Sequence, residues 1–175
     1  MLDSALVELG EVGHAGFTMA RVAQRAGVHE TTVYRRWPKR EDLIVDAFMQ
    51  LTDAELPVPN TGSLAGDLRI VLTNLARLFE TPIGQSMVSI GFSARMIPDF
   101  SASSVALVKA RIEIGQQVFA HAIARGEWPS GYDELAVFTE LVGPLLARYF
   151  LLHEAITPEV IDARIEAVLA HSTSR

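Results

Sequence analysis

The sequence predicts an all-α protein of about nine helices, and three observations support this prediction. No stretch alternates apolar and polar residues with β-branched enrichment, and no Asn-Gly or Asp-Gly hairpin turn is present. Apolar residues instead recur at helical spacing along most of the 175 residues. The segments between these stretches contain residues that commonly begin and end helices. We expect two domains, residues 1–50 and 51–175, and a proline-rich linker over residues 56–62.

Short helices open the chain. Residues 2–9 have one apolar face, and Gly10 and Gly13 follow as the expected end of that helix. Thr18 is a favourable N-cap for the second helix, because its hydroxyl can accept a hydrogen bond from a backbone N–H of the first turn. Gly27 is expected to end the second helix, since glycine adopts a positive φ without steric cost.

Two further short helices are expected before the linker. The third spans about residues 30–37 and stops at Pro38, which cannot continue a helix. The fourth spans about residues 41–51 and has Glu41 and Asp42 in its first turn, where the helix dipole favours acids.

Five longer helices are expected after the linker. They begin at N-cap residues or prolines, with Ser63 or Thr61 as the cap of the first, and one of them closes at Gly126, a favourable C′ residue. Asp133 is the expected N-cap of a nearly all-apolar helix, and Thr157-Pro158 begins the last one. The expected ranges are about 63–80, 82–96, 101–125, 133–153 and 158 onward.

The composition excludes several classes of protein. With 49% hydrophobic residues the chain can form a substantial core, which excludes intrinsic disorder. The longest apolar run, residues 141–152, contains Gly143, Pro144 and Arg148, so we expect no membrane span. The absence of cysteine excludes disulfides and thiolate metal sites. The first residues lack a charged and apolar leader, and we therefore expect a soluble cytoplasmic protein.

The charge of the chain is unevenly distributed. Its net charge is −6, but residues 14–40 contain six Lys and Arg against the single acid Glu30. This segment therefore carries +5 and the rest of the chain −11. Such asymmetry indicates a module that faces a polyanion, although a solvated basic face remains the alternative.

The basic segment also contains a helix-turn-helix pattern. Ala23 is small enough for two helices to approach closely, and Gly27 permits the turn between them. The second helix of such a motif lies in the DNA major groove. On that helix we expect Val33 and Trp37 to face inward and Tyr34 and Arg35 to be exposed. A helical bundle that does not bind DNA remains the alternative.

Several short motifs of the chain match the signature of a known family. They are Phe17-Thr18, Val22-Ala23, Arg25 to Val28, Thr31 to Pro38 and Glu41-x-Leu43, together with Gly143 to Leu146, a pattern of one branch of that family. With these residues the chain resembles the tetracycline-repressor-type (TetR) transcriptional regulators. The resemblance implies a homodimer that binds a palindromic operator, usually as a repressor, and a C-terminal domain that binds a small effector and dimerises.

The resemblance assigns DNA-contacting roles to individual residues. Arg35 could donate two hydrogen bonds to guanine, and Glu30 could accept one from cytosine N4. The positions at or near base edges are Glu30, Thr31, Tyr34 and Arg35. The phosphate-side positions are Thr18, Thr32, Arg36, Lys39 and Arg40, flanked by Arg21 and Arg25.

The chain departs from the family pattern at three places. His29 and Lys39 stand where short capping side chains are usual, which weakens each cap by about 1 kcal/mol. Arg40 replaces a lysine and changes the donor geometry. Met1 falls inside the first helix, where the family has a preceding basic arm, so without that arm we expect weaker binding with a smaller salt dependence.

The apolar helix over residues 133–153 suggests a dimer interface. A helix that is apolar all round must be covered on all sides, and a second chain could cover one face. Burial in the core of one chain is the alternative. The expected interface residues are Leu141, Leu145, Tyr149, Leu152, Ile161, Ile165 and Val168.

Methionine and aromatic residues at helical spacing are candidates for an effector site. Because few charged residues lie among them, we expect an apolar or aromatic effector, although core packing is the alternative for each residue. The candidates are Met87, Phe92, Met96, Phe100, Phe119, Ile123, Trp128 and Phe138.

Enzymatic sites are not indicated. The five histidines form no metal-binding spacing, and His153-Glu154 more readily ends a helix than binds a metal. The sequence contains no GxSxG, P-loop or GxGxxG motif, so we expect no cofactor and no catalysis. Two rivals to a DNA-binding regulator remain open: a dimeric small-molecule-binding protein with weakened DNA binding, and an all-α enzyme.

Overall fold

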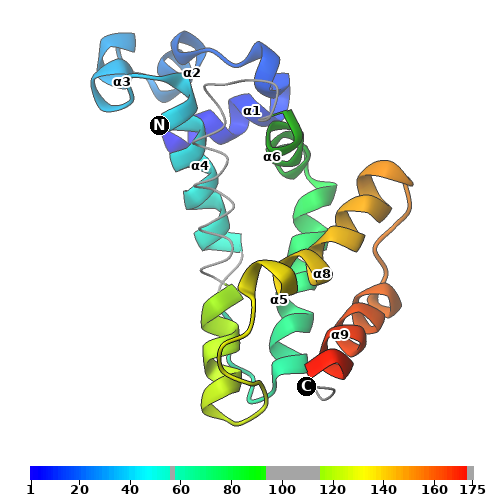
Figure 1. Ribbon diagram of the computed structural model, residues 1–175. Coiled ribbons are helices and arrows are strands. Elements are labelled where there is room, and N and C mark those ends of the chain that lie inside the picture. Colours follow the sequence, from blue (N-terminus) through cyan, green and yellow to red (C-terminus); the bar gives the residue numbers. More distant parts are fainter. Residues whose placement is uncertain (56–57, 94–114, 173–175) are drawn as a thin grey trace. The chain divides into compact units, whose positions relative to one another are not determined.

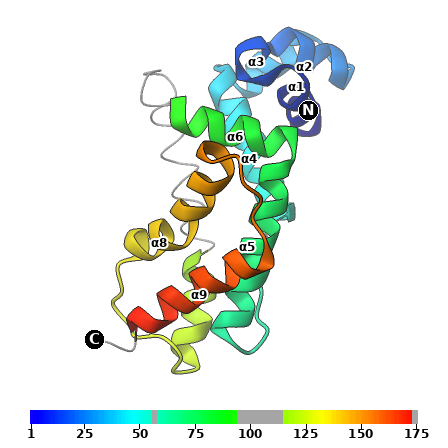
Figure 2. The same ribbon diagram turned by 90° about the vertical axis from the view of Figure 1, so that its right-hand side faces the viewer.

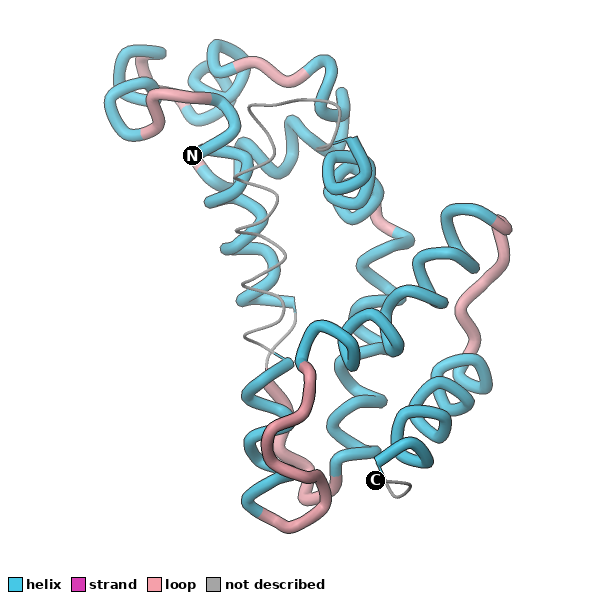
Figure 3. Tube along the Cα trace, in the orientation of Figure 1, coloured by secondary structure: helices cyan, strands magenta, loops and turns pink. Residues whose placement is uncertain are grey.

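The computed structural model of the protein describes residues 1–55, 58–93 and 115–172. Every regular element in these residues is a helix, so the predicted all-α class is confirmed (Figure 3). The expected helix over 101–125 lies only partly within the described residues, where it is helical over 115–124. None of the described helices is long and apolar enough to cross a membrane.

The chain divides into two compact units, Met1–Glu55 with Leu78–Lys109 and Leu56–Arg77 with Ala110–Arg175. The first unit includes α6 (Pro82–Ser93) in addition to the amino-terminal helices. The domain boundary expected at residue 50 stays a prediction.

The first unit is built around α1, which packs against α2, α4 and α6 (Figure 1). Its amino-terminal helices are α1 (Leu2–Gly16), α2 (Met19–Ala26), α3 (Glu30–Arg36) and α4 (Arg40–Glu55). Large side chains fill the space between these helices and exclude water from it. Fully or almost fully buried among them are Leu9, Phe17, Val22, Val33, Trp37, Leu43, Ile44 and Phe48.

The first helix is longer than expected, because Gly10 does not end it. At Gly10 a Cβ would lie only 3.2 Å from Cγ1 of Ile83, so glycine allows α6 to approach α1 closely. Gly13 interrupts the helix with φ 63° and ψ −177°, and one further helical turn then reaches Gly16. The prediction that the two glycines end the helix was therefore wrong for Gly10, whereas Gly13 does break the regular helix as predicted.

The second unit contains most of α5 (Leu64–Glu80), the helix over 115–124, α8 (Glu134–Leu146), the π-helix η1 (Ala147–Leu151) and α9 (Pro158–Ser172) (Figure 2). Several predicted caps are confirmed. The Ser63 hydroxyl accepts from Gly66 N at 3.1 Å, and the Asp133 carboxylate accepts from Ala136 N at 2.9 Å. Gly126 ends the helix over 115–124 with φ 77°.

The apolar helix expected over 133–153 changes type before its end. It is α-helical to Leu146 and then continues as the π-helix η1. Pro144 lies just before this change and lacks the N–H that an α-helix needs. His153 follows η1 with a positive φ of 55°, which confirms that the helix ends there.

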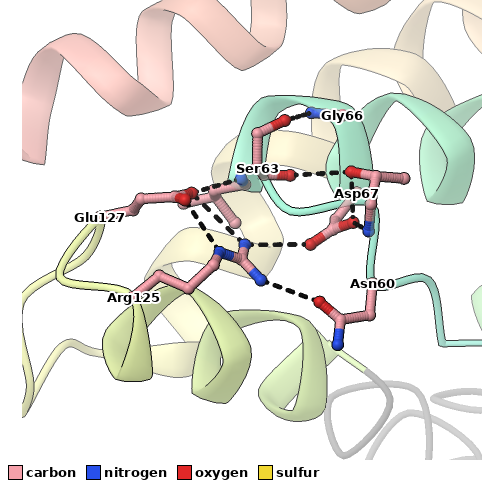
Figure 4. A network of polar contacts seen from close by, with 8 residues as sticks. Asn60, Ser63, Gly66, Asp67, Arg125 and Glu127 are labelled. Atoms are coloured by element: carbon pink, nitrogen blue, oxygen red, sulfur yellow. Dashed lines mark hydrogen bonds and ion pairs between the residues drawn. The ribbon is translucent and has the colours of Figure 1, made fainter.

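A polar network joins the start of α5 to the end of the helix over 115–124 (Figure 4). The Asp67 carboxylate is fully buried and accepts hydrogen bonds from Thr61 N at 2.6 Å, Thr61 Oγ1 at 2.8 Å and Arg125 Nη2 at 3.2 Å. Arg125 also donates to Asn60 and Glu127. Burial alone would raise the pKa of Asp67, but the bonds from Thr61 and Arg125 outweigh it and lower the pKa.

Candidate nucleic-acid interface

The turn between α2 and α3 has the geometry that the helix-turn-helix pattern predicts. Thr18 Oγ1 accepts from Arg21 N at 3.3 Å, which confirms Thr18 as the N-cap of α2. Gly27 has φ 67°, and its N–H donates to the Gln24 carbonyl. Ala23 is almost fully buried where the predicted close approach of two helices requires a small residue. This local structure fixes the direction in which α3 leaves the turn.

Helix α3 buries one face and exposes the other, as predicted. Val33 is 0% exposed and Trp37, just beyond its end, is 2% exposed. Tyr34 is 47% exposed, and Arg35 is exposed beside it. The remaining residues predicted to lie near base edges, Glu30 and Thr31, are also exposed. The helix therefore presents polar side chains that a duplex can reach.

Trp37 anchors the end of α3 to α4 through a contact that the sequence did not predict. Its Nε1 donates a 2.7 Å hydrogen bond to Asp46 Oδ2. The guanidinium carbon of Arg36 lies 4.7 Å from the centroid of the Trp37 ring, a cation–π arrangement. These contacts restrain both the helix end and the arginine beside it.

Three arginines of the basic segment form ion pairs within the protein: Arg40, which was predicted on the phosphate side, and Arg21 and Arg25, which were predicted to flank it. Arg21 pairs with Glu8, Arg25 pairs with both Glu8 and Glu11, and Arg40 pairs with its neighbour Glu41. The hydrogen bond to Glu11 is the main cause of the raised pKa of Arg25. The pairing partners in α1 were not predicted, because the expected face of that helix comprised only its apolar residues.

The remaining cations gather at and just beyond the end of α3. Arg35, Arg36 and Lys39 are exposed, and none of them forms an ion pair with the residues that the structure describes. Thr32 is half-buried, and the side chain of His29 makes no capping hydrogen bond, as its departure from the family pattern predicts. Positive charge that is not neutralised is thus concentrated around α3.

The predicted effector residues lie in both units. In the second unit, the ring centroids of Phe119 and Trp128 are 5.0 Å apart, and Tyr132, which was not predicted, lies 5.0 Å from Phe119. Ile123 and Phe138 are half-buried in the same unit, whereas Met87 is buried in the first unit. The side chain of Phe92, and Met96 and Phe100 entirely, lie outside the described residues.

Most of the predicted dimer-interface residues are buried within a single chain. They belong to the packing of α8 against α9, which favours the alternative that they form the core of one chain. The buried residues are Leu141, Leu145, Ile161, Ile165 and Val168, each at most 5% exposed. Tyr149 is half-buried and Leu152 is 63% exposed. Leu135 and Leu151, which were not predicted, are also exposed.

The described residues contain no group of three or more His, Asp or Glu placed to hold a metal ion. Their most distinctive functional feature is the motif of α2 and α3, with its buried inner face and exposed cationic outer face. Fold and motif together define a helix-turn-helix protein.

Comparison with known proteins identifies the family. Residues 1–47 match the model of bacterial regulatory proteins of the tetR family, and residues 58–168 match that of the tetracyclin repressor-like C-terminal domain. The chain is 31% identical to the HTH-type transcriptional regulator AqdR of Rhodococcus erythropolis over 153 residues, covering 87% of this chain and 73% of AqdR. The chain belongs to the TetR family of transcriptional regulators.

Solved structures share the same fold. The TetR family transcription regulator SCO0332 superposes with a TM-score of 0.83 at 24% identity, covering 97% of this chain and 94% of that one. The flavonoid-responsive regulator FrrA superposes with a TM-score of 0.67 at 22% identity, covering 99% and 93%.

Proposed function

We propose that this regulator is a repressor that binds a palindromic operator as a homodimer and responds to a small effector. The observation that carries the proposal is the exposure of Tyr34 and Arg35 on α3 beside the cations Arg36 and Lys39, while Val33 and Trp37 hold the helix from within. A helix that is anchored on one face and cationic on the other suits the major groove of DNA.

The exposed side chains of α3 divide by chemistry into two groups. Arg35 is the residue suited to guanine O6 and N7, and Glu30, Thr31 and Tyr34 lie near base edges. Arg36 and Lys39 contact phosphates, which fixes the position of the helix without reading sequence. Thr18, Thr32 and Arg40 complete the phosphate side.

Dimerisation through α8, η1 and α9 would place two copies of α3 on successive turns of the duplex. The support for this interface is the apolar surface of Leu135, Leu151 and Leu152, which are 58%, 70% and 63% exposed in one chain. Large apolar side chains left exposed along one helical segment favour burial against a second copy. A two-fold dimer reads half-sites about 34 Å apart, or a small multiple of that distance.

The effector is proposed to be apolar or aromatic and to bind in the C-terminal region. The rings of Phe119, Trp128 and Tyr132 supply aromatic faces there. The structural neighbour FrrA is described as flavonoid-responsive, which is an example of such an effector on this fold. The effector can change DNA binding only by binding one conformation of the dimer more tightly than another.

A mobility-shift assay over a series of salt concentrations tests the proposal, using DNA fragments selected from genomic DNA by the protein. Wild-type binding should weaken steeply as salt rises. Arg36→Ala should weaken binding to every sequence, whereas Arg35→Ala should relax the preference at one base position by about 1–3 kcal/mol. Arg69→Ala, an exposed arginine of α5 paired with Asp162, is the matched control and should bind as wild type does.

The same assay can overturn the proposal. Binding that does not depend on salt, or equal losses for Arg36→Ala and Arg69→Ala, would contradict a DNA interface on α3. Retained ligand binding without DNA binding would favour a dimeric small-molecule-binding protein. Turnover of a bound ligand would favour an enzyme.

A further inference from the structure

Glu8 is a carboxylate buried beside the predicted DNA-binding helices. It lies in α1 and is 0% exposed, and its side chain faces α2. A charge removed from water in this way is costly unless opposite charges compensate it. The compensation comes from Arg21 and Arg25, which the family resemblance places beside the phosphate-side positions of the interface.

The two arginines meet the acids of α1 in different ways. The ion pair of Arg21 with Glu8 brings Nε to 2.5 Å from Oε1, and this oxygen accepts no hydrogen bond from the residues that the structure describes. Arg25 places its Nη2 between two carboxylates, 3.3 Å from Glu8 Oε2 and 2.5 Å from Glu11 Oε2. Arg25 is thus held by hydrogen bonds to two acids, whereas Arg21 is held by an ion pair with one acid.

The way in which Arg21 is held leaves its terminal nitrogens available. A guanidinium has five N–H donors, of which Nε carries one and the two terminal nitrogens carry four. Neither terminal nitrogen of Arg21 bonds to a residue that the structure describes, and 51% of the side chain is exposed. A surface hollow of about 400 Å³, lined by Glu8, Arg21, Gln24 and Arg25, opens beside it.

We propose that Glu8 is a positioning residue for DNA binding: its buried charge holds the guanidinium of Arg21 beside α1, and the two terminal nitrogens of that guanidinium face a phosphate of the DNA backbone. The inference rests on the proposed function. A guanidinium that is oriented before binding donates two parallel hydrogen bonds to phosphate and loses less side-chain entropy than a free one. Glu8 thus promotes the binding of a polyanion although it is itself an acid.

For Glu8→Gln, this role predicts a change in DNA affinity opposite in direction to the change that charge alone predicts. Removing an acid near the interface reduces its repulsion of DNA, so charge alone predicts tighter binding for Glu8→Gln. Loss of the positioned guanidinium predicts weaker binding. Glu11→Gln is the matched control, because it makes the same change of charge in the same helix and leaves Arg21 paired with Glu8.

The experiment measures the fluorescence anisotropy of a labelled mixed-sequence duplex with the full-length chain at several salt concentrations. We expect Glu8→Gln to bind roughly three- to tenfold more weakly than wild type, the effect of one hydrogen-bonded contact, and Glu11→Gln to bind at least as tightly as wild type. In an Arg21→Ala background, Glu8→Gln should cause no further loss, since Glu8 acts through Arg21.

Three outcomes separate the possibilities. Equal affinity of Glu8→Gln and Glu11→Gln, or equal losses from Glu8→Gln with and without Arg21, would overturn the positioning role. If wild type shows no salt-dependent binding, the proposed function itself fails. If circular dichroism shows that Glu8→Gln does not fold, Arg21→Lys is the deciding variant. Its ammonium can neutralise Glu8, but it lacks the planar fork that donates two parallel hydrogen bonds to phosphate while Glu8 is paired, so binding that matches wild type would overturn the inference.

Discussion

Replacing Asp67 by asparagine tests whether the buried network at the start of α5 stabilises the second unit. The amide oxygen can keep both bonds from Thr61, but its NH₂ group would then face Arg125 Nη2, a second donor. The lost hydrogen bond to a charged group is worth about 2–3 kcal/mol. For a chain of this size, that loss lowers the melting temperature by roughly 4–12 °C.

Asp162→Asn is the matched control, because it makes the same substitution in an ion pair of the same unit. Asp162 pairs with Arg69 at 2.7 Å, but their side chains are 43% and 53% exposed. An exposed pair contributes only about 0–1 kcal/mol, so its melting temperature should fall by less than about 4 °C. Thermal melts followed by circular dichroism measure both variants. Equal shifts would refute the assignment of stability to the buried network.

The pH dependence of the Asp67 variant gives a second check. Because the folded-state pKa of Asp67 is lowered from its ordinary 3.8, the ionised carboxylate contributes stability that is fully present well above 3.8. This contribution is lost as the pH falls through the folded-state pKa, when wild type becomes protonated at that site. The stability difference between wild type and Asp67→Asn should therefore shrink as the pH falls from 6 toward 3. A difference that stays constant over this pH range would contradict a stabilising role of the ionised Asp67 carboxylate.

Three further predictions concern other parts of the protein. Trp37→Phe should lower the free energy of unfolding by about 1–2 kcal/mol more than Trp128→Phe, because among the described residues only the indole of Trp37 donates a hydrogen bond. Urea titration measures both losses, and equal losses would argue that the bond from Trp37 to Asp46 does not anchor α3. Gly27→Ala should destabilise the protein by about 1 kcal/mol, because Gly27 has a φ of 67° that alanine rarely adopts. Gly91→Ala should instead stabilise it by about 0.5–1 kcal/mol, because Gly91 lies within α6 and a Cβ there would meet no other atom within 4 Å. Calorimetry measures both changes, and the same sign for both would be inconsistent with this backbone geometry. Leu152→Asp should shift the chain from dimer toward monomer in sedimentation equilibrium, and an unchanged mass would argue against the proposed interface.

Local signals in the sequence predicted much of the fold. Thr18, Ser63 and Asp133 act through neighbouring N–H groups, and Gly27 and Gly126 through their own φ, so a short stretch of chain determines each outcome. The inward direction of Val33 and Trp37 also followed from helical spacing. These are properties that a helix has before it packs against another.

Features that depend on distant partners could not be predicted in this way. A glycine such as Gly10 looks the same in the sequence whether it ends a helix or allows another helix to pack closely. The close packing of Ile83 against Gly10 is visible only in the structure. Glu8 and Arg21 meet across two helices, so their spacing in the sequence carries no signal of the ion pair. An apolar stripe such as that of Leu145 cannot show whether its own chain or a second copy covers it.

The two tryptophans of the chain are divided between its compact units, Trp37 in the first and Trp128 in the second. Each unit thus has its own natural optical reporter. With either indole removed, the emission of the other would follow the melting of one unit alone, and the response to a candidate effector could be assigned to one half of the protein without attaching a dye.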